Sequence, residues 1–405
     1  MKKAFALIVV LFFVVGSITF ANAACLPTAL QGSQQALASG ADLDFIRVMK
    51  DEYGLVHPDG EIYVHSSGTD AWSACDPSSP QQRIYKLNPG SPPSISLWNV
   101  PQAEDLQAGD NQTFPDVIKS PDGTKHVFFT TNSPRAKIYY NAQNSQGVWQ
   151  HNQSQKIIDL GNGTLAVVDV LWDESSPFYN PHNSQYYKGL MYFINQAGCW
   201  ASGAGTAGVL AVAYCNDPLN WVGPYDVGNP NCNFNQALHT EQGGAMYYNG
   251  CIYLMLFEGK ISAYYDEFLD GTTMTRLYYA TPANPENVTV LQNGNYLTAN
   301  GIYAPGAGGY ENTKALISVT MAFDPTSGNM YMGRTYTYPV NYSGYGDEIP
   351  CYTGGICFSG LLSRTIRAQL YSMNLGSPPS MMGLWTGSWT LMGDWGASHG
   401  YSMEQ

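Results

Sequence analysis

Acidic side chains stand at matching points of a repeated pattern in this chain of 405 residues, which contains only 31 Asp and Glu. One or two of them precede each of four successive turns: Asp51 and Glu52, then Asp116, then Asp169 and Asp173, then Glu241. A carboxylate in a partly apolar pocket loses hydration, so its recurrence indicates a function rather than a requirement of folding. Two carboxyls that face one pocket suit the cleavage of a glycosidic bond. One protonates the leaving oxygen, and the other activates water or attacks the sugar.

A third carboxylate beside such an acid can keep it protonated through like-charge repulsion. Taken singly, each acid could instead be a solvated loop residue or a turn cap. We interpret three acids in that way: Asp59, Asp122 and Asp173. The choice between Asp51 and Glu52 stays open, because Asp42 and Asp44 lie nearby.

The turns that organise these acids share a glycine followed by an aromatic-rich alternating strand, as in Asn249-Gly250-Cys251-Ile252-Tyr253-Leu254. Asp-Gly and Asn-Gly are strong signals for a β-hairpin, because a type I′ turn needs positive φ at both central residues. The glycines follow one another at intervals of 63, 66, 61 and 78 residues, at Gly60, Gly123, Gly189, Gly250 and Gly328.

A four-stranded repeat of about 40–50 residues is typical of a propeller blade, and longer loops would lengthen it. Five repeats without a linker predict an all-β chain that forms a single five-bladed β-propeller of four-stranded antiparallel blades over residues 24–405. The alternative is a pair of β-sandwich domains in which the spacing arises by chance. We expect stretch 85–112 to be a long loop, and the C-terminal stretch with Trp385, Trp389 and Trp395 to close the ring against the first blade.

The composition fits this architecture and excludes one class of partner. Acidic residues outnumber basic ones by 31 to 18, for a formal charge of −13, which argues against nucleic-acid binding. Hydrophobic residues make up 44% of the chain, enough to bury a large core. The 42 glycines and 24 prolines suit many short strands and turns.

The first 23 residues predict an export signal. Lys2 and Lys3 precede an apolar run, and Ala21-Asn22-Ala23 supplies small residues where a signal peptidase reads them. A membrane anchor and, through Cys25, a lipoprotein are the alternatives. We therefore expect a secreted or periplasmic monomer with no membrane contact after cleavage.

Export would expose the eight cysteines to an oxidising environment, where an even number without metal-ligand spacing indicates disulfides. The connectivity does not follow from sequence, so we favour pairs that are close in the chain. The predicted pairs are Cys351–Cys357, Cys199–Cys215, Cys232–Cys251 and, by remainder, Cys25–Cys75.

One stretch resembles the general-acid blade of glycoside hydrolase family 43, the arabinanases and β-xylosidases. It runs from Thr240-Glu241-Gln242-Gly243-Gly244 through the turn at Gly250 to Phe257-Glu258-Gly259. The family has Glu-Gly-Pro, a strand, a glycine turn, a second strand and often Glu-Gly there. Phe114-Pro115-Asp116 is similar to the family's Trp-Ala-Pro segment, and Val168-Asp169 resembles the blade whose Asp modulates the pKa of the acid.

The resemblance implies a glycosidase that acts with inversion on arabinose- or xylose-type polysaccharides or oligosaccharides. By order and spacing, Asp51 is then the general base, Asp169 the pKa modulator and Glu241 the general acid. The carboxyls of such a base and acid stand about 6.5–9.5 Å apart, with room for a water molecule. The expected substrate-binding residues are Asp116, Trp172 and Glu258.

The chain departs from the family pattern directly after each of these acids, at Glu52, Val170 and Gln242. A propeller can keep its shape without its chemistry, so a non-catalytic propeller that binds glycan or a partner surface is the alternative. No HExxH motif occurs, and we expect no catalytic metal and no required cofactor. Some five-bladed relatives hold a structural calcium ion on the axis with a histidine nearby, for which His126 and His239 are the candidates.

Overall fold

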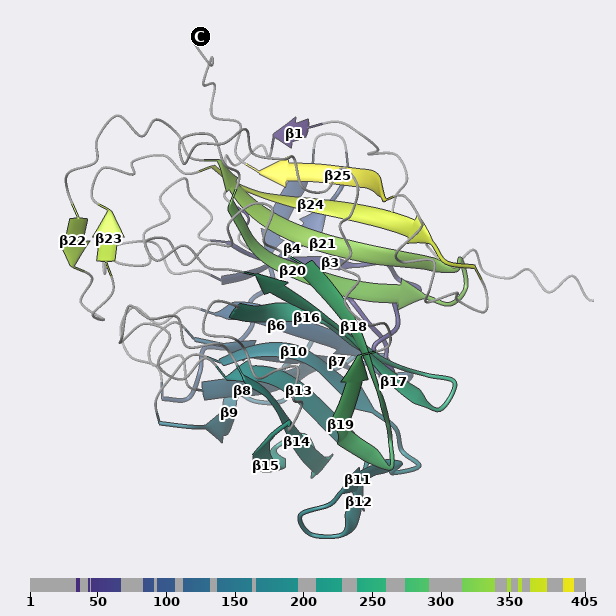
Figure 1. Cartoon of the computed structure of the whole chain (residues 1–405). Coiled ribbons are helices and arrows are strands. Elements are labelled where there is room, and N and C mark those ends of the chain that lie inside the picture. The colour runs from purple at the N-terminus through teal and green to yellow at the C-terminus, as the bar shows by residue number, and fades with distance from the viewer. Residues whose placement is uncertain are drawn as a thin grey trace, which may run out of the picture.

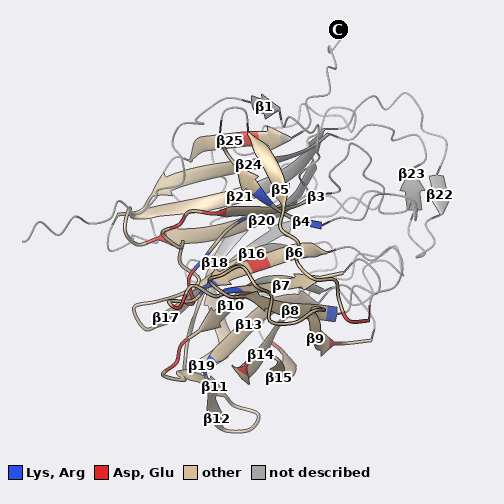
Figure 2. Cartoon of the chain, turned by 180° about the vertical axis from the view of Figure 1, so that it is seen from behind, with Lys and Arg blue, Asp and Glu red and all other residues tan. Residues whose placement is uncertain are grey.

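The computed structural model describes residues 34–36, 43, 45–66, 83–90, 93–105, 112–131, 137–161, 165–195, 209–227, 239–259, 274–290, 315–338, 348–350, 356–358, 365–376 and 389–396. Within these ranges all regular secondary structure is β-strand, and five sheets of four or five strands follow one another in chain order (Figure 1). Two further sheets have two strands each, and one of them pairs β22 (Glu348–Pro350) with β23 (Ile356–Phe358). Charged residues are sparse along the strands (Figure 2), in keeping with a chain that is only 12% charged. No helix that could span a membrane occurs in the described part.

Each of the five blades has four antiparallel strands. Blade 1 contains β2 (Phe45–Val48), β3 (Ile62–Ser66), β4 (Arg83–Asn88) and β5 (Ser94–Leu97). Blade 2 contains β6 (Thr113–Lys119), β7 (Lys125–Thr130), β8 (Lys137–Gln143) and β9 (Gln155–Asp159). Blade 3 contains β10 (Leu165–Trp172), β13 (Gly189–Asn195), β14 (Val209–Asp217) and β15 (Asn220–Asp226). Blade 4 contains β16 (His239–Tyr248), β17 (Cys251–Gly259), β18 (Met274–Thr281) and β19 (Asn284–Val290), and blade 5 contains β20 (Ala315–Asp324), β21 (Asn329–Tyr338), β24 (Thr365–Asn374) and β25 (Thr390–Gly396).

The first strand of each blade lies nearest the axis. These inner strands contact one another in the order β2, β6, β10, β16 and β20, and β20 returns to β2. The blades therefore form one closed ring. The predicted five-bladed propeller is confirmed, and the alternative of two sandwich domains is excluded.

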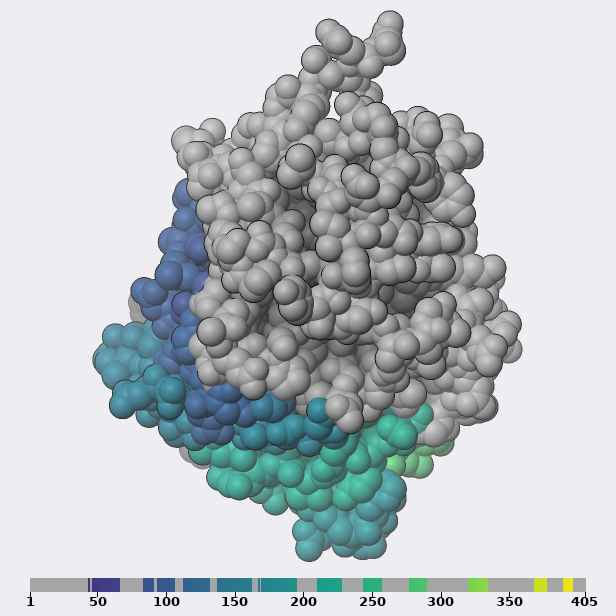
Figure 3. All heavy atoms as spheres, turned by 90° about the vertical axis from the view of Figure 1, so that its left-hand side faces the viewer, coloured from purple at the N-terminus to yellow at the C-terminus, as the bar shows by residue number. Residues whose placement is uncertain are grey.

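The repeated glycines join the first and second strands of the blades, as predicted. Gly60, Gly123, Gly250 and Gly328 have φ between 63° and 86°, the left-handed region that glycine adopts without steric cost. Gly189 differs, because it is the first residue of β13 rather than part of a turn. In blade 3 an inserted hairpin, β11 (Phe178–Asn180) with β12 (Gln185–Tyr187), takes the place of the short turn and projects from the ring (Figures 1 and 3).

The ends of the described chain meet at blade 5. Strand β1 (Gln34–Ala36) pairs in parallel with β25, the outermost strand of that blade. Trp395 of β25 is 1% exposed and packs in one apolar cluster with Ile46 and Val48 of blade 1. The expectation that the C-terminal stretch closes the ring against the first blade is confirmed for Trp395, whereas Trp385 lies outside the described residues.

Stretch 85–112 is not the long loop that its prolines and glycine suggested. It contains the end of β4 and all of β5, the outer edge of blade 1. Pro93 directly precedes Ser94, the first residue of β5. An edge strand tolerates proline there, because the missing N–H is not needed by a neighbouring strand.

The two described cysteines of the predicted pairs, Cys215 and Cys251, are free thiols. Cys215 of β14 pairs with Gly189, the first residue of β13. Asn195, the last residue of β13, lies about 20 Å further along that strand, and the chain continues from it toward Cys199. Cys251 starts β17 at the end of the blade away from His239, the first described residue after Cys232. The described residues that precede Cys199 and follow Cys232 in the chain, Asn195 and His239, thus lie at the strand ends away from Cys215 and Cys251. Cys25, Cys75, Cys199, Cys232 and Cys351 lie outside the described residues, as does the Cys357 side chain.

Candidate active site

One loop closes the ring axis at one end. Residues 49–57, which connect β2 to β3, bond through their backbone to the last residues of the inner strands in all four other blades. The bonds are Lys50 N to Val117 O (3.1 Å), Trp172 N to Glu52 O (2.6 Å), Tyr247 N to Tyr53 O (2.7 Å) and Val56 N to Phe323 O (2.8 Å). We call residues 49–57 the axial loop. It does not reach the other end of the axis, where the inner strands begin, and we call that the open end.

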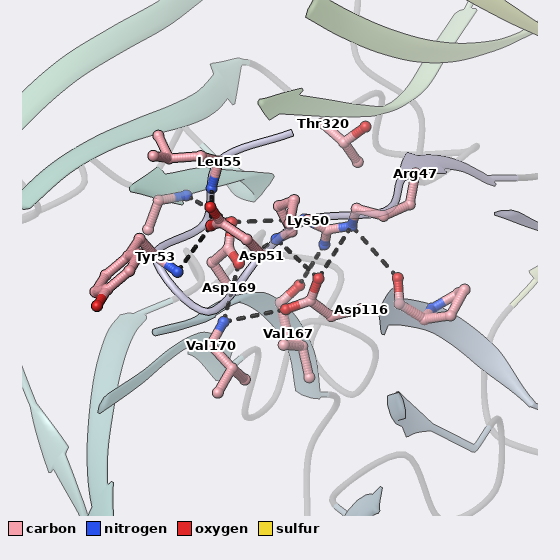
Figure 4. Close-up of polar contacts among 12 residues, drawn as sticks. Arg47, Lys50, Asp51, Tyr53, Leu55, Asp116, Val167, Asp169, Val170 and Thr320 are labelled. Atoms are coloured by element: carbon pink, nitrogen blue, oxygen red, sulfur yellow. Dashed lines mark hydrogen bonds and ion pairs between the residues drawn. The ribbon is translucent and has the colours of Figure 1, made fainter. Parts of the chain in front are cut away.

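Four charged side chains meet beside the axial loop (Figure 4), and we call Arg47, Lys50, Asp116 and Asp169 the hub cluster. All four are at most 1% exposed. Lys50 Nζ lies 2.8 Å from Asp116 Oδ1 and also contacts Asp169 Oδ1. The guanidinium of Arg47 lies 3.9 Å from a carboxylate oxygen of each aspartate. Two cations and two carboxylates leave the cluster without net charge when all four are ionised.

Hydrogen bonds from the hub cluster to the backbone connect neighbouring blades. They are Val170 N to Asp116 Oδ2 (3.0 Å), Ala245 N to Asp169 Oδ2 (2.8 Å), Arg47 Nε to Pro115 O (3.3 Å) and Arg47 Nη2 to Val167 O (3.3 Å). Blades 1 to 4 are therefore joined through these side chains. Thr320 of blade 5 completes the circle, because its hydroxyl donates to Ile46 O (2.6 Å).

β-Bulges near the start of the inner strands position these carboxylates. The register of the first strand pair shifts between Thr113 and Asp116, between Val167 and Asp169, between Glu241 and Gly243, and between Leu316 and Ser318. A bulge turns the neighbouring side chain to a new direction and is frequent beside active sites. Asp116 and Asp169 are thus equivalent residues of consecutive blades. Blade 4 has Gly243 at this point, where an added Cβ would lie 1.6 Å from Met255 O.

The two hub carboxyls differ in acidity. Burial raises the pKa of Asp169 to about 7, because loss of hydration outweighs the attraction of Lys50. Burial also acts on Asp116, but Lys50 and Arg47 outweigh it and lower the pKa of that residue. Acids whose pKa values are separated in this way can hold and release a proton near neutral pH. Both are 0% exposed, so neither presents its carboxylate to a ligand.

Glu241 lies on β16, nearer to the open end than Asp169. Asp169 binds the amide of Ala245, which follows Glu241 by four residues, about 13 Å along an extended strand. Glu258 lies on the adjacent strand β17, where it pairs with Thr240. The backbones of the predicted acid and of this predicted substrate-binding residue are therefore neighbours. Their side chains lie outside the described residues.

Asp51 and Trp172 lie at the closed end instead. Asp51 Oδ1 accepts hydrogen bonds from the amides of Tyr53 and Leu55, both at 2.9 Å, and so holds the axial loop in shape. Burial, with Glu52 adding to it, raises the pKa of Asp51 to about 6. Tyr53 is bonded to Tyr247, which is about 20 Å along β16 from Glu241. The structure thus does not bring Asp51 and Glu241 to one level of the axis.

Trp172, a predicted substrate-binding residue, is the last residue of β10. Its indole N–H donates to Glu174 Oε1 (2.8 Å) at the closed end. Asp116, predicted for the same role, is enclosed in the hub cluster. Neither residue lies where a ligand at the open end would contact it.

Among the side chains that the structure describes, no set of three or more His, Cys, Asp or Glu residues could hold a metal ion. His126, a candidate neighbour of the expected calcium, bonds to Ser120 (2.9 Å) and Tyr140 (2.8 Å) within blade 2. The side chain of His239 lies outside the described residues, so the expectation of calcium stays a prediction.

The basic half of the hub cluster was missed from the sequence. Arg47 and Lys50 stand in the stretch Phe45-Ile46-Arg47-Val48-Met49-Lys50, whose other side chains are apolar. Two cations within an otherwise apolar strand are a signal, because a buried charge needs a partner of opposite sign. With four acids placed on the neighbouring strands, that signal could have predicted the pairing.

Solved structures share this fold at low sequence identity. Three mutants of levansucrase from B. megaterium align with TM-scores of 0.52, 0.51 and 0.50 and identities of 11%, 11% and 10%. The alignments cover 92%, 92% and 89% of this chain and the same shares of the three levansucrase chains. Comparisons with protein-family models and with curated proteins find no match. The likeness establishes the five-bladed propeller fold, while the resemblance to family 43 in particular remains a prediction.

Proposed function

We propose that this protein is a secreted glycosidase that works at the open end of the ring, with Glu241 as its general acid. The observation that supports this most is the position of Glu241. It precedes a bulge on an inner strand of blade 4, beside Glu258 on the next strand and above a charge-neutral hub. The fold is shared with levansucrase. The substrate class we propose is arabinose- or xylose-type polysaccharide or oligosaccharide.

The general base must come from a different blade at the same level as Glu241. Asp51 sits in the axial loop, whereas Asp44, which lies outside the described residues, is followed in the sequence by Phe45, the first residue of β2. We therefore assign the base to Asp44 in this proposal. Such a pair, about 6.5–9.5 Å apart, would hydrolyse the linkage with inversion. In this proposal Asp169 supports the site from below, because it holds the amide of Ala245 on the strand that carries Glu241.

Glycan binding without hydrolysis is a second candidate, favoured by one specific observation. Lys50 and Arg47 neutralise both buried carboxylates, so those acids are held as a structural cluster rather than presented to a sugar. In that case the open end would still bind a polysaccharide or a partner surface. Binding and hydrolysis must therefore be measured on the same set of glycans.

The test is a hydrolysis and binding screen against arabinans, xylans and their oligosaccharides, with the mature monomer and no added cofactor. We expect Glu241→Gln and Asp44→Asn each to lower hydrolysis at least about 100-fold, the scale of general acid–base catalysis. Glu174→Gln is the matched control, because Glu174 is 68% exposed at the closed end, and it should keep wild-type activity. A wild-type protein that binds a glycan but releases no sugar would support the second candidate, and full activity of Glu241→Gln would refute the acid assignment.

A further inference from the structure

The ammonium group of Lys50 stands between two buried carboxylates from different blades. It contacts Asp116 Oδ1 at 2.8 Å and also Asp169 Oδ1. All three side chains are 0% exposed. Buried carboxylates from separate strands are the oxygen donors that a hard cation such as Ca²⁺ selects. Here the ammonium group of Lys50 occupies the position between the two carboxylates.

The second carboxylate oxygen of each aspartate already has a partner. Val170 N donates to Asp116 Oδ2, and Ala245 N donates to Asp169 Oδ2. The nearby carbonyls of Pro115 and Val167 accept from Arg47, as described above. Calcium needs six to eight oxygen ligands. The hub cluster as it stands does not fit a calcium ion.

We propose that Lys50 is a built-in cation that occupies the hub of the ring, so that this protein binds no metal ion between Asp116 and Asp169. Charge balance supports it, because two ionised and buried carboxylates beside Arg47 alone would leave an excess negative charge with no water to solvate it. Lys50 belongs to the axial loop, so the loop that covers one end of the axis also carries the cation. Removing the side chain should turn the hub into a site for an added cation.

The experiment is thermal unfolding of wild type and Lys50→Ala, each in EDTA, Ca²⁺, n-propylammonium or 1-propanol. n-Propylammonium replaces the atoms that the substitution deletes, and 1-propanol has a similar size without the charge. We expect Lys50→Ala to lower the unfolding midpoint by about 5–10 °C, since breaking a buried ion pair is strongly destabilising. Ca²⁺ or n-propylammonium should restore at least half of this loss, 1-propanol should not, and wild type should respond to none of them.

Two further variants make the result specific. Lys137→Ala removes a lysine that is 15% exposed and paired with Asp105, and it should lower the midpoint by no more than about 2 °C without any cation response. Lys50→Ala with Asp169→Asn removes the excess charge together with its partner. It should be more stable than Lys50→Ala and should fold even where the single variant does not.

The proposal is overturned by any of four results. The first is a wild-type midpoint that rises with Ca²⁺, when this rise is absent from Asp116→Asn. The second is a Lys50→Ala midpoint equal to that of wild type, and the third is a lowered Lys50→Ala midpoint that neither cation restores. The fourth is failure of the charge-balanced double variant to fold. All readouts are midpoints of unfolding. They are therefore independent of whether the protein hydrolyses a glycan.

Discussion

Asp169 should make the stability of this protein depend on pH in a direction opposite to that of most carboxylates. Its pKa is raised to about 7 in the folded protein, against about 3.9 in an unfolded chain. The folded state therefore binds the proton more tightly, and unfolding releases it. The free energy of unfolding should fall as the pH rises through this window and level off above the folded pKa. From about pH 5 to about pH 8 the loss is on the order of 2–3 kcal/mol.

The assay is urea-induced unfolding of wild type and Asp169→Asn at a series of pH values across this range. Other titrating groups, including Asp51, are common to both proteins and cancel in the difference between them. We expect wild type to lose stability relative to Asp169→Asn as the pH rises. Glu174→Gln is the control, because Glu174 is 68% exposed and pairs with Lys188, and its difference from wild type should stay nearly constant. The raised pKa would be refuted if the difference in free energy of unfolding between wild type and Asp169→Asn did not depend on pH. It would also be refuted if wild type gained stability relative to Asp169→Asn as the pH rises.

Substitutions at three further positions test how the ring and its axial loop are built. Gly243→Ala would place a Cβ 1.6 Å from Met255 O and should lower the free energy of unfolding in urea by more than about 3 kcal/mol. Gly250→Ala has open space around the added Cβ but a φ of 75°, and it should lower the free energy of unfolding by about 1 kcal/mol. Equal costs would contradict the close approach at Gly243. Asp51→Ala should lose about 1–2 kcal/mol with its two loop hydrogen bonds, and Asp51→Asn, which keeps an acceptor oxygen, should lose less and retain hydrolysis. Loss of activity with unchanged stability in Asp51→Asn would return the role of base to Asp51.

The turns and the number of blades could be predicted because their signals are local. An Asn-Gly or Asp-Gly pair before an alternating strand fixes a hairpin through the backbone freedom of two residues, as at Asn249-Gly250, where both residues have positive φ. The spacing of these hairpins then gave the ring. Blade 3 shows the limit, since Gly189 keeps the interval although an inserted hairpin replaces the turn.

The arrangement of the acids could not be predicted in the same way, because it depends on pairing between distant strands. Asp51 seemed equivalent to Asp169, but residues 49–57 leave blade 1 and bond to the four other blades. A single extra residue at a bulge decides which way Asp116 and Asp169 point, and no local motif marks it. The two predicted disulfides that involve Cys215 and Cys251 were wrong for the same reason, since both are free thiols and sequence separation does not show which end of a strand a residue occupies.

The reaction at Glu241 is the central claim, and proton NMR of the products tests it most directly. A fresh incubation of wild-type protein with an arabino- or xylo-oligosaccharide should show the new reducing end first in the inverted anomeric configuration, before mutarotation mixes the anomers. Glu241→Gln should form no such signal over the same time. A reducing end that forms equally fast with Glu241→Gln, or no product from wild type on any of the glycans, would contradict a glycosidase that uses this residue.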